Sequence, residues 1–298
     1  MYDVVIVGGG PAGLFLACDL RLAGVSAVVL ERLREPDVSD KAHGLTGLSV
    51  RLLHQRGLFE RCGGVGAPTP APGFYFGAMP LALRLLGGDH PLYLLKCYQA
   101  ELERVLLERA LSLQVDFRRG WEMRSLSQAN AHVEVVASDP DGNETTLQAK
   151  YVVGCDGGRS AVRAAVGIEF QGARDDAIVD RTALSAPNEE LPKVVFHRTE
   201  RGIFSLMPHD PQVPIVHTSE WESGPPSHEP MTLAEMQQSV TRVLGKPVEL
   251  SPPPGHAPDL RRVRGRNTRI AERYRVGRVF IAGDAAHISY GPTLNLAV

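Results

Sequence analysis

The stretch that decides the fold covers residues 2–32 and reads YDVVIVGGGPAGLFLACDLRLAGVSAVVLER. Its first six residues form a short, β-branched apolar run, which is typical of a buried strand. A glycine-rich turn follows, and apolar residues then recur at helical spacing at Leu14, Ala17, Leu20 and Leu22. Residues 26–30 predict a second buried strand, and Glu31 stands at its end. The order strand, glycine turn, helix, strand and acid is that of one complete nucleotide-binding unit.

The glycine turn, GGGPAG at residues 8–13, has a physical role for each of its key positions. Gly8 permits a tight turn, Gly10 lets the backbone approach a pyrophosphate, and Gly13 allows the helix to pack closely on the strand. The helix N-terminus offers free N–H groups to phosphate, and Glu31 can accept hydrogen bonds from ribose hydroxyls. Taken alone, the glycine pattern is also that of a loop that merely turns. The surrounding strands and acid predict a dinucleotide site, without distinguishing FAD from NAD.

The composition of the 298 residues, 43% hydrophobic and 22% charged, predicts a soluble globular protein of one large or two ordinary domains. The formal net charge of -2 argues against a nucleic-acid binder. Residues 261–278 do hold eight arginines, but they contain one aromatic residue and no nucleic-acid motif. We interpret this arginine run as a solvated face or loop.

The cysteines and histidines give no metal or disulfide signature. Cys18, Cys62, Cys97 and Cys155 show neither CxxC nor zinc spacing, so we expect reduced, buried thiols and a cytoplasmic location. The ten histidines show no clustered ligand spacing, so we expect no metal. The first strand begins at residue 2, which leaves no room for a signal peptide, and no apolar run is long enough to cross a membrane.

Two further apolar strands also end in glycine and aspartate. Residues 151–155 (YVVGC) lead into DGGRS at residues 156–160, with Ser160 as a natural N-cap. Residues 279–282 (VFIA) lead into Gly283 and Asp284. In an open parallel sheet the carboxyl ends of such strands point to one crevice. For the Asp156 motif alone, an ordinary turn with a capping aspartate is an equally good reading.

The rest of the chain divides into helical and β-rich parts. Apolar spacing predicts helices over residues 48–55, 99–113, 161–166 and 233–244, and strands over residues 115–117, 122–126, 132–137 and 145–149. The sequence DPDG at residues 139–142 predicts a hairpin turn. Glycine- and proline-rich residues 62–72 predict an exit from the first domain, and residues 251–258 predict the return from an inserted β-rich module.

These motifs together resemble the group A flavoprotein monooxygenases, the class of para-hydroxybenzoate hydroxylase, and within it the aromatic polyketide hydroxylases and rifampicin monooxygenases. The resemblance spans essentially the whole chain and rests on GGGPAGL at residues 8–14, LRLAGVSAVVLER at 20–32, QRGLFER at 55–61, VGCDGGRSAVR at 153–163 and ERYRVGRVFIAGDAAH at 272–287. It implies an α/β fold, with a Rossmann-like FAD-binding domain and an inserted β-sheet-rich substrate domain. The expected FAD-binding domain is residues 1–72, 96–166 and 262–298, and the expected substrate domain is residues 73–95 and 167–261, with the family's C-terminal helix and any further domain absent.

The resemblance also assigns residues to the cofactor. The FAD pyrophosphate would meet Gly8, Gly10, Pro11, Ala12 and Gly13, and the adenosine ribose would meet Glu31 with Arg32 alongside. Asp156, supported by Arg163, belongs to a motif associated with FAD and NADPH, and Gly283 and Asp284 would bind the ribityl chain with a helix N-terminus following. Further contacts would come from Gln99, from the backbone at Met123 and from Lys41, where the family usually has arginine. Pro292, Leu294 and Asn295 belong to a loop beside the flavin that is shorter here than in the family.

The activity that the resemblance implies is a FAD-dependent monooxygenation. NADPH or NADH would reduce FAD, and O2 would hydroxylate a small phenolic or polyketide-type aromatic substrate through a flavin C4a-hydroperoxide, in antibiotic biosynthesis or modification. Candidate substrate-pocket residues are Phe74, Phe76, Phe204 and Met207, with ordinary sheet core as the alternative for each. No side chain is singled out as catalytic.

The rival functions are a FAD oxidoreductase without oxygenation and a truncated, non-catalytic flavin-binding protein. Neither nucleic acid nor membrane is an expected partner, and the oligomeric state stays open.

Overall fold

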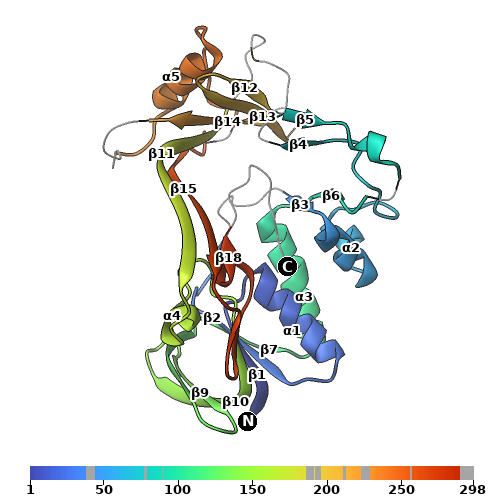
Figure 1. Cartoon of the computed structure of the whole chain (residues 1–298), viewed down its shortest axis with the longest axis vertical. Helices are drawn as coiled ribbons and strands as arrows, with labels where there is room; N and C mark the ends of the chain where they lie inside the picture. The colour runs from blue at the N-terminus through green and yellow to red at the C-terminus, as the bar shows by residue number, and fades with distance from the viewer. Residues whose placement is uncertain are drawn as a thin grey trace. The chain divides into compact units, whose positions relative to one another are not determined.

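The computed structural model describes residues 1–37, 44–76, 79–88, 90–185, 191, 196–210, 213–222, 229–255 and 257–288 (Figure 1). The chain divides into two units, each built from separate stretches of sequence. Unit 1 comprises Met1–Ala71, Leu86–Gly172 and Thr268–Val298, and unit 2 comprises Pro72–Leu85 and Ala173–Asn267.

A parallel β-sheet forms the centre of unit 1. Its parallel strands follow the spatial order β17-β10-β1-β2-β7, and β16 pairs antiparallel with β17 at one edge. The bounds are Tyr2–Val7 for β1, Ala27–Glu31 for β2, Asp116–Arg119 for β7, Glu144–Gly154 for β10, Arg275–Val276 for β16 and Val279–Ile281 for β17. The central strands are continuous apolar runs because both faces of a parallel sheet are covered.

Different layers cover the two faces of this sheet. In β1, Val4 and Ile6 face α1 (Pro11–Leu22) and α3 (Gln99–Ser112), which lie side by side in Figure 1. Val5 and Val7 face the opposite way, toward a ribbon of β8 (Glu122–Gln128) and β9 (Val133–Ser138) that continues into β10. Since side chains alternate along a strand, one apolar run contributes to two cores.

Smaller elements complete unit 1. They are β3 (Gly44–Thr46), which pairs with β6 (Leu94–Lys96), together with α2 (Leu48–Gln55), η1 (Glu60–Cys62), α4 (Ala161–Ala165), η3 (Gly283–Ala285) and β18 (His287–Ile288).

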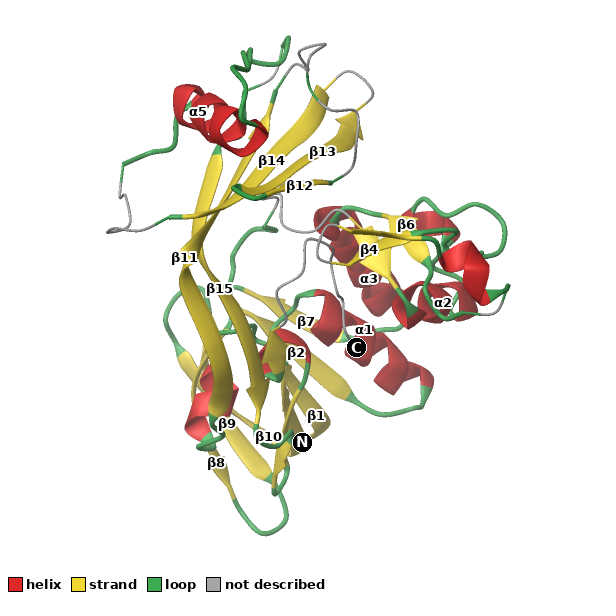
Figure 2. Cartoon of the chain, turned by 45° about the horizontal axis from the view of Figure 1, so that its top comes forward, coloured by secondary structure: helices red, strands yellow, loops and turns green. Residues whose placement is uncertain are grey.

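A second sheet, with a helix on one face, forms most of unit 2 (Figure 2). Its strands follow the order β12-β13-β14-β11-β15-β18, in which β18 pairs with Arg269 and Ile270 of β15. The bounds are His197–Thr199 for β12, Gly202–Asp210 for β13, Val213–Trp221 for β14, Phe170–Leu184 for β11 and Arg261–Ala271 for β15. Phe204 and Val216 of the sheet share a buried cluster with Met236 and Val240 of α5 (Leu233–Leu244). A separate hairpin of β4 (Phe74–Phe76) and β5 (Met79–Leu81), followed by the short 3-10 helix η2 (Leu83–Leu86), comes from the other stretch of sequence.

A buried network of charges joins the strands of unit 2 to α5. Arg181 on β11 is 4% exposed, and it donates to Glu235 at 2.8 Å and to Glu220 at 3.2 Å, and also pairs with Glu222. Arg262 on β15 donates to Glu235 as well. Burial alone would raise the pKa of Glu235, but hydrogen bonds from Arg262 and Arg181 outweigh burial and lower it. The expectation of a loop is therefore wrong for residues 261–271, which form strand β15, and the expectation of solvated arginines is wrong for Arg262 and Arg264, which pair with carboxylates.

The structure confirms several expected elements and changes others. The helices at residues 48–55 and 233–244 have the expected bounds, and Asp139 holds the hairpin turn by accepting hydrogen bonds from the N–H groups of Asp141 and Asn143, both at 2.9 Å. The two strands expected within residues 145–155 are one strand, β10, because its first half pairs with β9 and its second half with β1 and β17. The chain returns to unit 1 at Leu86, earlier than residue 96, because β6 pairs with β3.

Two kinds of feature are absent from the described ranges, a membrane-spanning helix and a cluster of metal-ligating side chains. No helix there combines the length and the apolar character needed to cross a bilayer. The same ranges contain no group of three or more His, Cys, Asp or Glu side chains that could hold a metal ion.

Candidate functional site

The carboxyl ends of four parallel strands lie next to one another along one edge of the unit 1 sheet. Backbone hydrogen bonds link them: Gly8 N–H donates to Leu30 at 2.8 Å, Cys155 N–H donates to Val7 at 2.7 Å and Ala282 N–H donates to Gly154 at 2.9 Å. The turns after β1, β2, β10 and β17 therefore meet at the crevice where open α/β sheets bind ligands.

The three glycines of the first turn have different surroundings. Gly8 has a φ of +108°, and an added Cβ would lie 2.3 Å from the carbonyl oxygen of Cys155. At Gly13 an added Cβ would lie 2.0 Å from the carbonyl oxygen of Gly8, so a side chain there would force α1 away from the strand. At Gly10 it would meet no heavy atom of the described chain within 4 Å. The fold itself requires Gly8 and Gly13, whereas the space at Gly10 is open to a ligand.

Helix α1 begins at this open space. Gly10 is its N-cap, Pro11 is its first residue, and no side chain of the described residues caps it by a hydrogen bond. Proline suits this position because it has no N–H to leave unpaired. The N–H groups of the following residues, Ala12 and Gly13, belong to the first turn, whose partial positive charge attracts an anion.

The carboxylate of Glu31 is held at the end of β2 by two backbone groups. Its Oε2 accepts a hydrogen bond from the N–H of Gly9 at 2.8 Å, and its Oε1 accepts one from the N–H of Leu33 at 2.8 Å. A carboxylate oxygen can accept a second hydrogen bond, so both oxygens keep capacity for a ligand hydroxyl. The side chain of Arg32 is exposed beside it. The sequence did not indicate this positioning role of Gly9, because the glycine motif specifies Gly8, Gly10 and Gly13 and leaves the position of Gly9 open.

Asp156 makes the capping contacts that one interpretation of its motif predicts, and its contact with a cofactor stays a prediction. Its Oδ2 accepts hydrogen bonds from the N–H groups of Ala161 at 2.7 Å and Val162 at 3.1 Å, so it caps α4. Its Oδ1 is buried and has no hydrogen-bond partner among the described residues. Leaving a buried acceptor unpaired costs about 1–3 kcal/mol, and more for a charged group. The capping aspartate is therefore confirmed, and its second oxygen lacks the donor that a bound group or water would supply.

The turns after β10 and β17 are tied together by Arg163. Its Nη1 donates to the carbonyl oxygen of Ala285 at 2.9 Å, and its Nη2 donates to that of Gly158 at 2.9 Å. The guanidinium lies 3.8 Å from the ring centroid of Phe170, and burial lowers the pKa of Arg163. This confirms the expected support of the Asp156 turn by Arg163, and extends it to the turn after β17.

Gly283 and Asp284 form that last turn. Gly283 has a φ of +61°, and an added Cβ would lie 3.0 Å from Cβ of Ala12, so this turn packs against the start of α1. Asp284 is exposed. In the described residues it is followed by the rest of η3 and then by β18, so the expected helix N-terminus after Asp284 is not found there.

Two other predicted contacts lie elsewhere in unit 1. Gln99 is the first residue of α3, and its Nε2 donates to Oε1 of Glu103 at 2.8 Å. Met123 is 8% exposed, and the pairing of β8 with β9 shifts register between Met123 and Ser125. Such a bulge leaves a backbone group unpaired in the β-ladder. The expected contacts of Gln99 with the flavin and of Met123 with adenine both stay predictions.

Several predicted residues cannot be placed. Lys41, Pro292, Leu294 and Asn295 lie outside the described residues, as do the side chains of Phe76 and Met207 in their strands.

The two remaining candidates for the substrate pocket differ. Phe74 is half-buried in β4, and its role stays a prediction. Phe204 is fully buried in the cluster beneath α5, so it offers no surface to a ligand. For Phe204 the substrate-pocket expectation is wrong and the alternative of ordinary sheet core holds.

A chain of polar contacts crosses the face of the unit 2 sheet that is turned away from Phe204. Ser205 on β13 pairs with His217 on β14, and its Oγ lies 3.3 Å from Nδ1 of His217. The Nε2 of His217 lies 3.5 Å from Oδ1 of Asp180 on β11. Because neighbouring side chains on a strand point to opposite faces, this cluster and the α5 core use alternate residues. The sequence reasoning missed it, since only the register of three strands brings these residues together.

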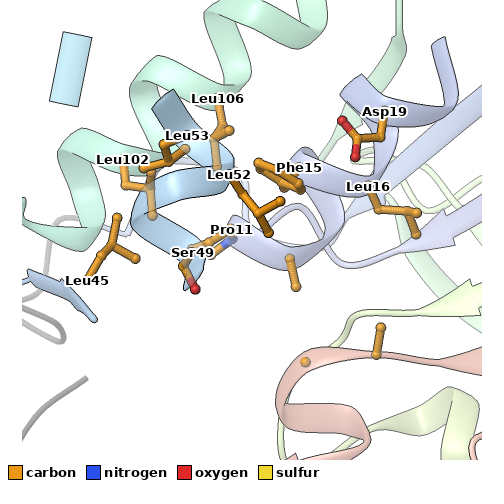
Figure 3. A pocket seen from close by; sticks show the side chains of 13 residues that line it. Pro11, Phe15, Leu16, Asp19, Leu45, Ser49, Leu52, Leu53, Leu102 and Leu106 are labelled. Carbon is orange, nitrogen blue, oxygen red and sulfur yellow. The ribbon is translucent and has the colours of Figure 1, made fainter. Parts of the chain in front are cut away.

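An apolar pocket of about 230 Å³ opens beside the glycine turn (Figure 3). Pro11, Ala12 and Gly283 of the two turns belong to its lining. Its apolar walls come mainly from Phe15, Leu16, Leu45, Leu52, Leu53, Leu102 and Leu106. Asp19 at its rim accepts two hydrogen bonds from Arg56, at 2.6 Å and 2.7 Å. Such walls suit an apolar ring or chain segment and do not suit a phosphate.

Comparison with known proteins assigns the family. A family model described as FAD binding domain matches residues 1–296. The chain belongs to this FAD-binding family. Rifampicin monooxygenase of Streptomyces venezuelae is 38% identical to the chain over 305 aligned residues, which cover 100% of this chain and 62% of that protein.

Two solved structures extend the comparison. The Diels-Alderase PyrE3 of pyrroindomycin biosynthesis has a TM-score of 0.82 at 33% identity, covering 98% of this chain and 61% of that one. The anhydrotetracycline hydroxylase OxyS from Streptomyces rimosus has a TM-score of 0.77 at 37% identity, covering 97% of this chain and 57% of that one. This FAD-binding chain thus spans about three fifths of the length of these relatives. The expected resemblance to flavoprotein monooxygenases and the expected α/β fold are confirmed.

The residues at the strand ends fit FAD on three observations. The space at Gly10 is free where a pyrophosphate would approach, and the adjoining start of α1 is uncapped by described side chains. The carboxylate of Glu31 is oriented and keeps acceptor capacity for a ribose. The buried Oδ1 of Asp156 lacks a donor. We therefore regard the FAD-binding family's cofactor as compatible with this chain.

Proposed function

We propose that the protein is a FAD-dependent monooxygenase that uses NAD(P)H and O2 to hydroxylate a phenolic or polyketide-type aromatic substrate. The observation that carries this proposal is the meeting of the glycine turn, Glu31, Asp156 and the Gly283 turn at one sheet edge of a FAD-binding chain. The reaction class is supported by the identity of 38% with a rifampicin monooxygenase and of 37% with an anhydrotetracycline hydroxylase.

Each group at the sheet edge has a task toward the cofactor. The first-turn N–H groups of α1 would bind the pyrophosphate, Glu31 would accept hydrogen bonds from the ribose, and Asp284 would accept them from the ribityl chain. When bound, FAD would take a hydride from NAD(P)H and activate O2 for transfer to the aromatic ring. Arg163 would support these groups indirectly, because its two hydrogen bonds hold the turns after β10 and β17 together.

We assign recognition of the substrate to unit 2. Phe74 is retained from the expected pocket residues, and Phe76 and Met207 are retained by their positions on β4 and β13. His217 is added, because an imidazole in contact with Ser205 and Asp180 can donate a hydrogen bond to a phenolic oxygen or accept one from it. The side chain of His217 keeps 14% of its surface exposed, whereas Ser205 is fully buried.

A second function is favoured by one specific observation. The neighbour PyrE3 is a Diels-Alderase, and it has a TM-score of 0.82 with this chain. A FAD-binding chain of this fold can accordingly serve a reaction other than hydroxylation. This observation favours, as one rival proposal, a protein that holds FAD without net oxidation. The other rival proposal, from the sequence, is a FAD oxidoreductase that does not oxygenate.

The test is anaerobic reduction of the FAD-loaded protein by NADPH in the presence of a panel of phenolic polyketides, followed by turnover under isotopically labelled O2. Faster bleaching of the flavin band with one compound, and one labelled oxygen atom in the product, would support the monooxygenase. Bleaching without label in the product would favour the oxidoreductase without oxygenation. A flavin that NADPH never bleaches would overturn the monooxygenase proposal and favour the flavin-holding function.

A further inference from the structure

Two of the four cysteines lie together in unit 1. Cys62 is the last residue of η1, and Cys97 stands between β6 and α3. They are 2% and 5% exposed and belong to the same core cluster; their side chains interact with each other, and the Cys97 thiol also makes a weak contact, at 3.6 Å, with the carbonyl oxygen of Tyr98. The backbones are close as well, since a Cβ added at Gly63 would lie 3.7 Å from the carbonyl oxygen of Lys96.

The contact makes the two sulfurs chemically different. The hydrogen bond from the Cys97 thiol lowers the pKa of Cys62, and the same bond raises the pKa of Cys97. Burial and the charge of Glu101 work against a thiolate at Cys62, and the charges of Arg61 and Arg104 favour it. Cys62 therefore has the character of an attacking sulfur and Cys97 that of its resolving partner.

The other two cysteines lack this arrangement. Burial raises the pKa of Cys18 to about 11, and burial raises that of Cys155 to about 12. Neither shows a thiol contact, and Cys18 has only a weak contact, at 3.7 Å, with the carbonyl oxygen of Leu106 in the described structure. Their raised pKa values disfavour the reactive thiolate in both, in Cys18, which is buried, and in Cys155, which is partly buried.

We propose that Cys62 and Cys97 are an oxidative modification site, which closes to an intrachain disulfide on reaction with hydrogen peroxide. The Cys62 sulfur attacks one peroxide oxygen, the O–O bond breaks, and the departing hydroxide leaves as water with the proton of the thiol. The Cys97 sulfur then attacks the Cys62 sulfur, the S–O bond breaks, and a second water leaves with the Cys97 proton. The two thiols lose two electrons, and the peroxide gains them.

The position of this disulfide gives it a structural consequence. It would close a loop of residues 63–96, which contains Pro72–Leu85, the first stretch that the chain contributes to unit 2. It would also tie η1 to the residue before Tyr98, the N-cap of α3. Closing a loop of this length reduces the freedom of the unfolded chain, so the oxidised protein should unfold at a midpoint about 4–8 °C higher than the reduced protein.

The test counts free thiols in the full chain. The reduced protein is treated with hydrogen peroxide, denatured and labelled with iodoacetamide, and the number of labels is read from the intact mass. We expect four labels before oxidation, two afterwards and four again after dithiothreitol. Trypsin cleaves after Arg61 and Lys96, so a disulfide would join two separate peptides, residues 62–84 and 97–104, in a mass that reduction splits.

Matched variants identify the pair. Cys18→Ser removes a thiol from the same core cluster and should still lose two labels on oxidation. Cys62→Ser should lose none, and Cys97→Ser should leave a sulfenic acid on Cys62 that dimedone traps. Four labels after peroxide, a loss of labels without the cross-linked peptide, or a cross-link to Cys18 or Cys155 would each overturn the proposal. The wild-type peptide map decides the matter even where a variant does not fold.

Discussion

Two glycines of the first turn, three residues apart, separate the demands of folding from those of cofactor binding. The change is the same at both: Gly10→Ala and Gly13→Ala each add one methyl group. At Gly13 the new Cβ would lie 2.0 Å from a backbone carbonyl oxygen, and at Gly10 it would meet no described heavy atom within 4 Å. Gly10→Ala should therefore lose affinity for FAD and keep its stability, whereas Gly13→Ala should lose stability.

The magnitudes follow from the surroundings. Overpacking costs about 1–3 kcal/mol and occasionally more, and the upper end applies to Gly13→Ala because the obstructing atom is backbone. For a chain of this size, 3 kcal/mol lowers the unfolding midpoint by about 6 °C. At Gly10 the small cost of alanine as an N-cap is offset by the reduced freedom of the unfolded chain, so stability should change by less than about 0.5 kcal/mol. Loss of one hydrogen bond to a charged phosphate costs about 1.5–3 kcal/mol, which weakens binding about 10- to 150-fold.

The assay has two readouts. The unfolding midpoint is measured without FAD, and the dissociation constant for FAD is measured by titration of flavin fluorescence. Gly88→Ala is the matched control, because Gly88 is exposed, has no described heavy atom within 4 Å of an added Cβ, and should change neither quantity. If Gly10→Ala binds FAD with wild-type affinity, the open space at Gly10 is not where the pyrophosphate binds. If Gly13→Ala has a wild-type unfolding midpoint, the close contact at Gly13 is not required for folding.

Four further changes test other parts of the chain. Glu31→Gln should weaken FAD binding about tenfold in the same titration, because one charged hydrogen-bond acceptor is lost. Arg181→Met should cost about 3 kcal/mol in urea unfolding, because it leaves buried carboxylates without their guanidinium, and Arg181→Lys should fall between it and wild type. In the folded protein the pKa of Glu235 lies below its ordinary value of 4.5. The stabilisation of the fold by the Glu235 carboxylate is therefore complete above pH 4.5 and is lost as the pH falls through the folded pKa. Between pH 5 and pH 3 the unfolding midpoint of Glu235→Gln should fall less than that of wild type. His217→Phe should weaken binding of a phenolic ligand, read from the flavin absorbance, and leave the affinity for FAD unchanged.

The sequence predicted the turns at the strand ends well because their determinants are local. A glycine that needs a φ of +108° and a helix that starts directly after it are properties of a few consecutive residues, so Gly8 to Gly13 could be interpreted without the rest of the chain. The same holds for the aspartate that caps α4 from five residues away. Parallel pairing of β1 with β2 and β10 then follows from the apolar runs, since such strands are buried on both faces.

The features that the sequence could not predict depend on pairing between distant strands. The arginines of β15 looked solvated because their carboxylate partners, Glu222 and Glu235, lie at least 27 residues away in the chain. Phe204 looked like a pocket residue because the alternation of β13 does not say which of its faces meets α5. The spacing of Cys62 and Cys97 in the sequence matches no cysteine motif, and the two residues come together because β6 pairs with β3.

The proposed assignment of FAD to unit 1 and of the substrate to unit 2 would let chains with similar cofactor sites catalyse different reactions. The three groups that fit FAD, at Gly10, Glu31 and Asp156, lie at strand ends in unit 1, and their geometry depends on the backbone of the parallel sheet. A hydroxylase and a Diels-Alderase both resemble the chain over nearly its whole length, so this cofactor site is compatible with either chemistry. What differs between such reactions is the substrate and the groups that hold it, and the candidates proposed for that role in this chain belong to unit 2: Phe74 and Phe76 on the β4–β5 hairpin, and Met207 and His217 on the larger sheet. A variant there that changes which ligand accelerates flavin reduction, with FAD affinity intact, would locate the choice of reaction in unit 2.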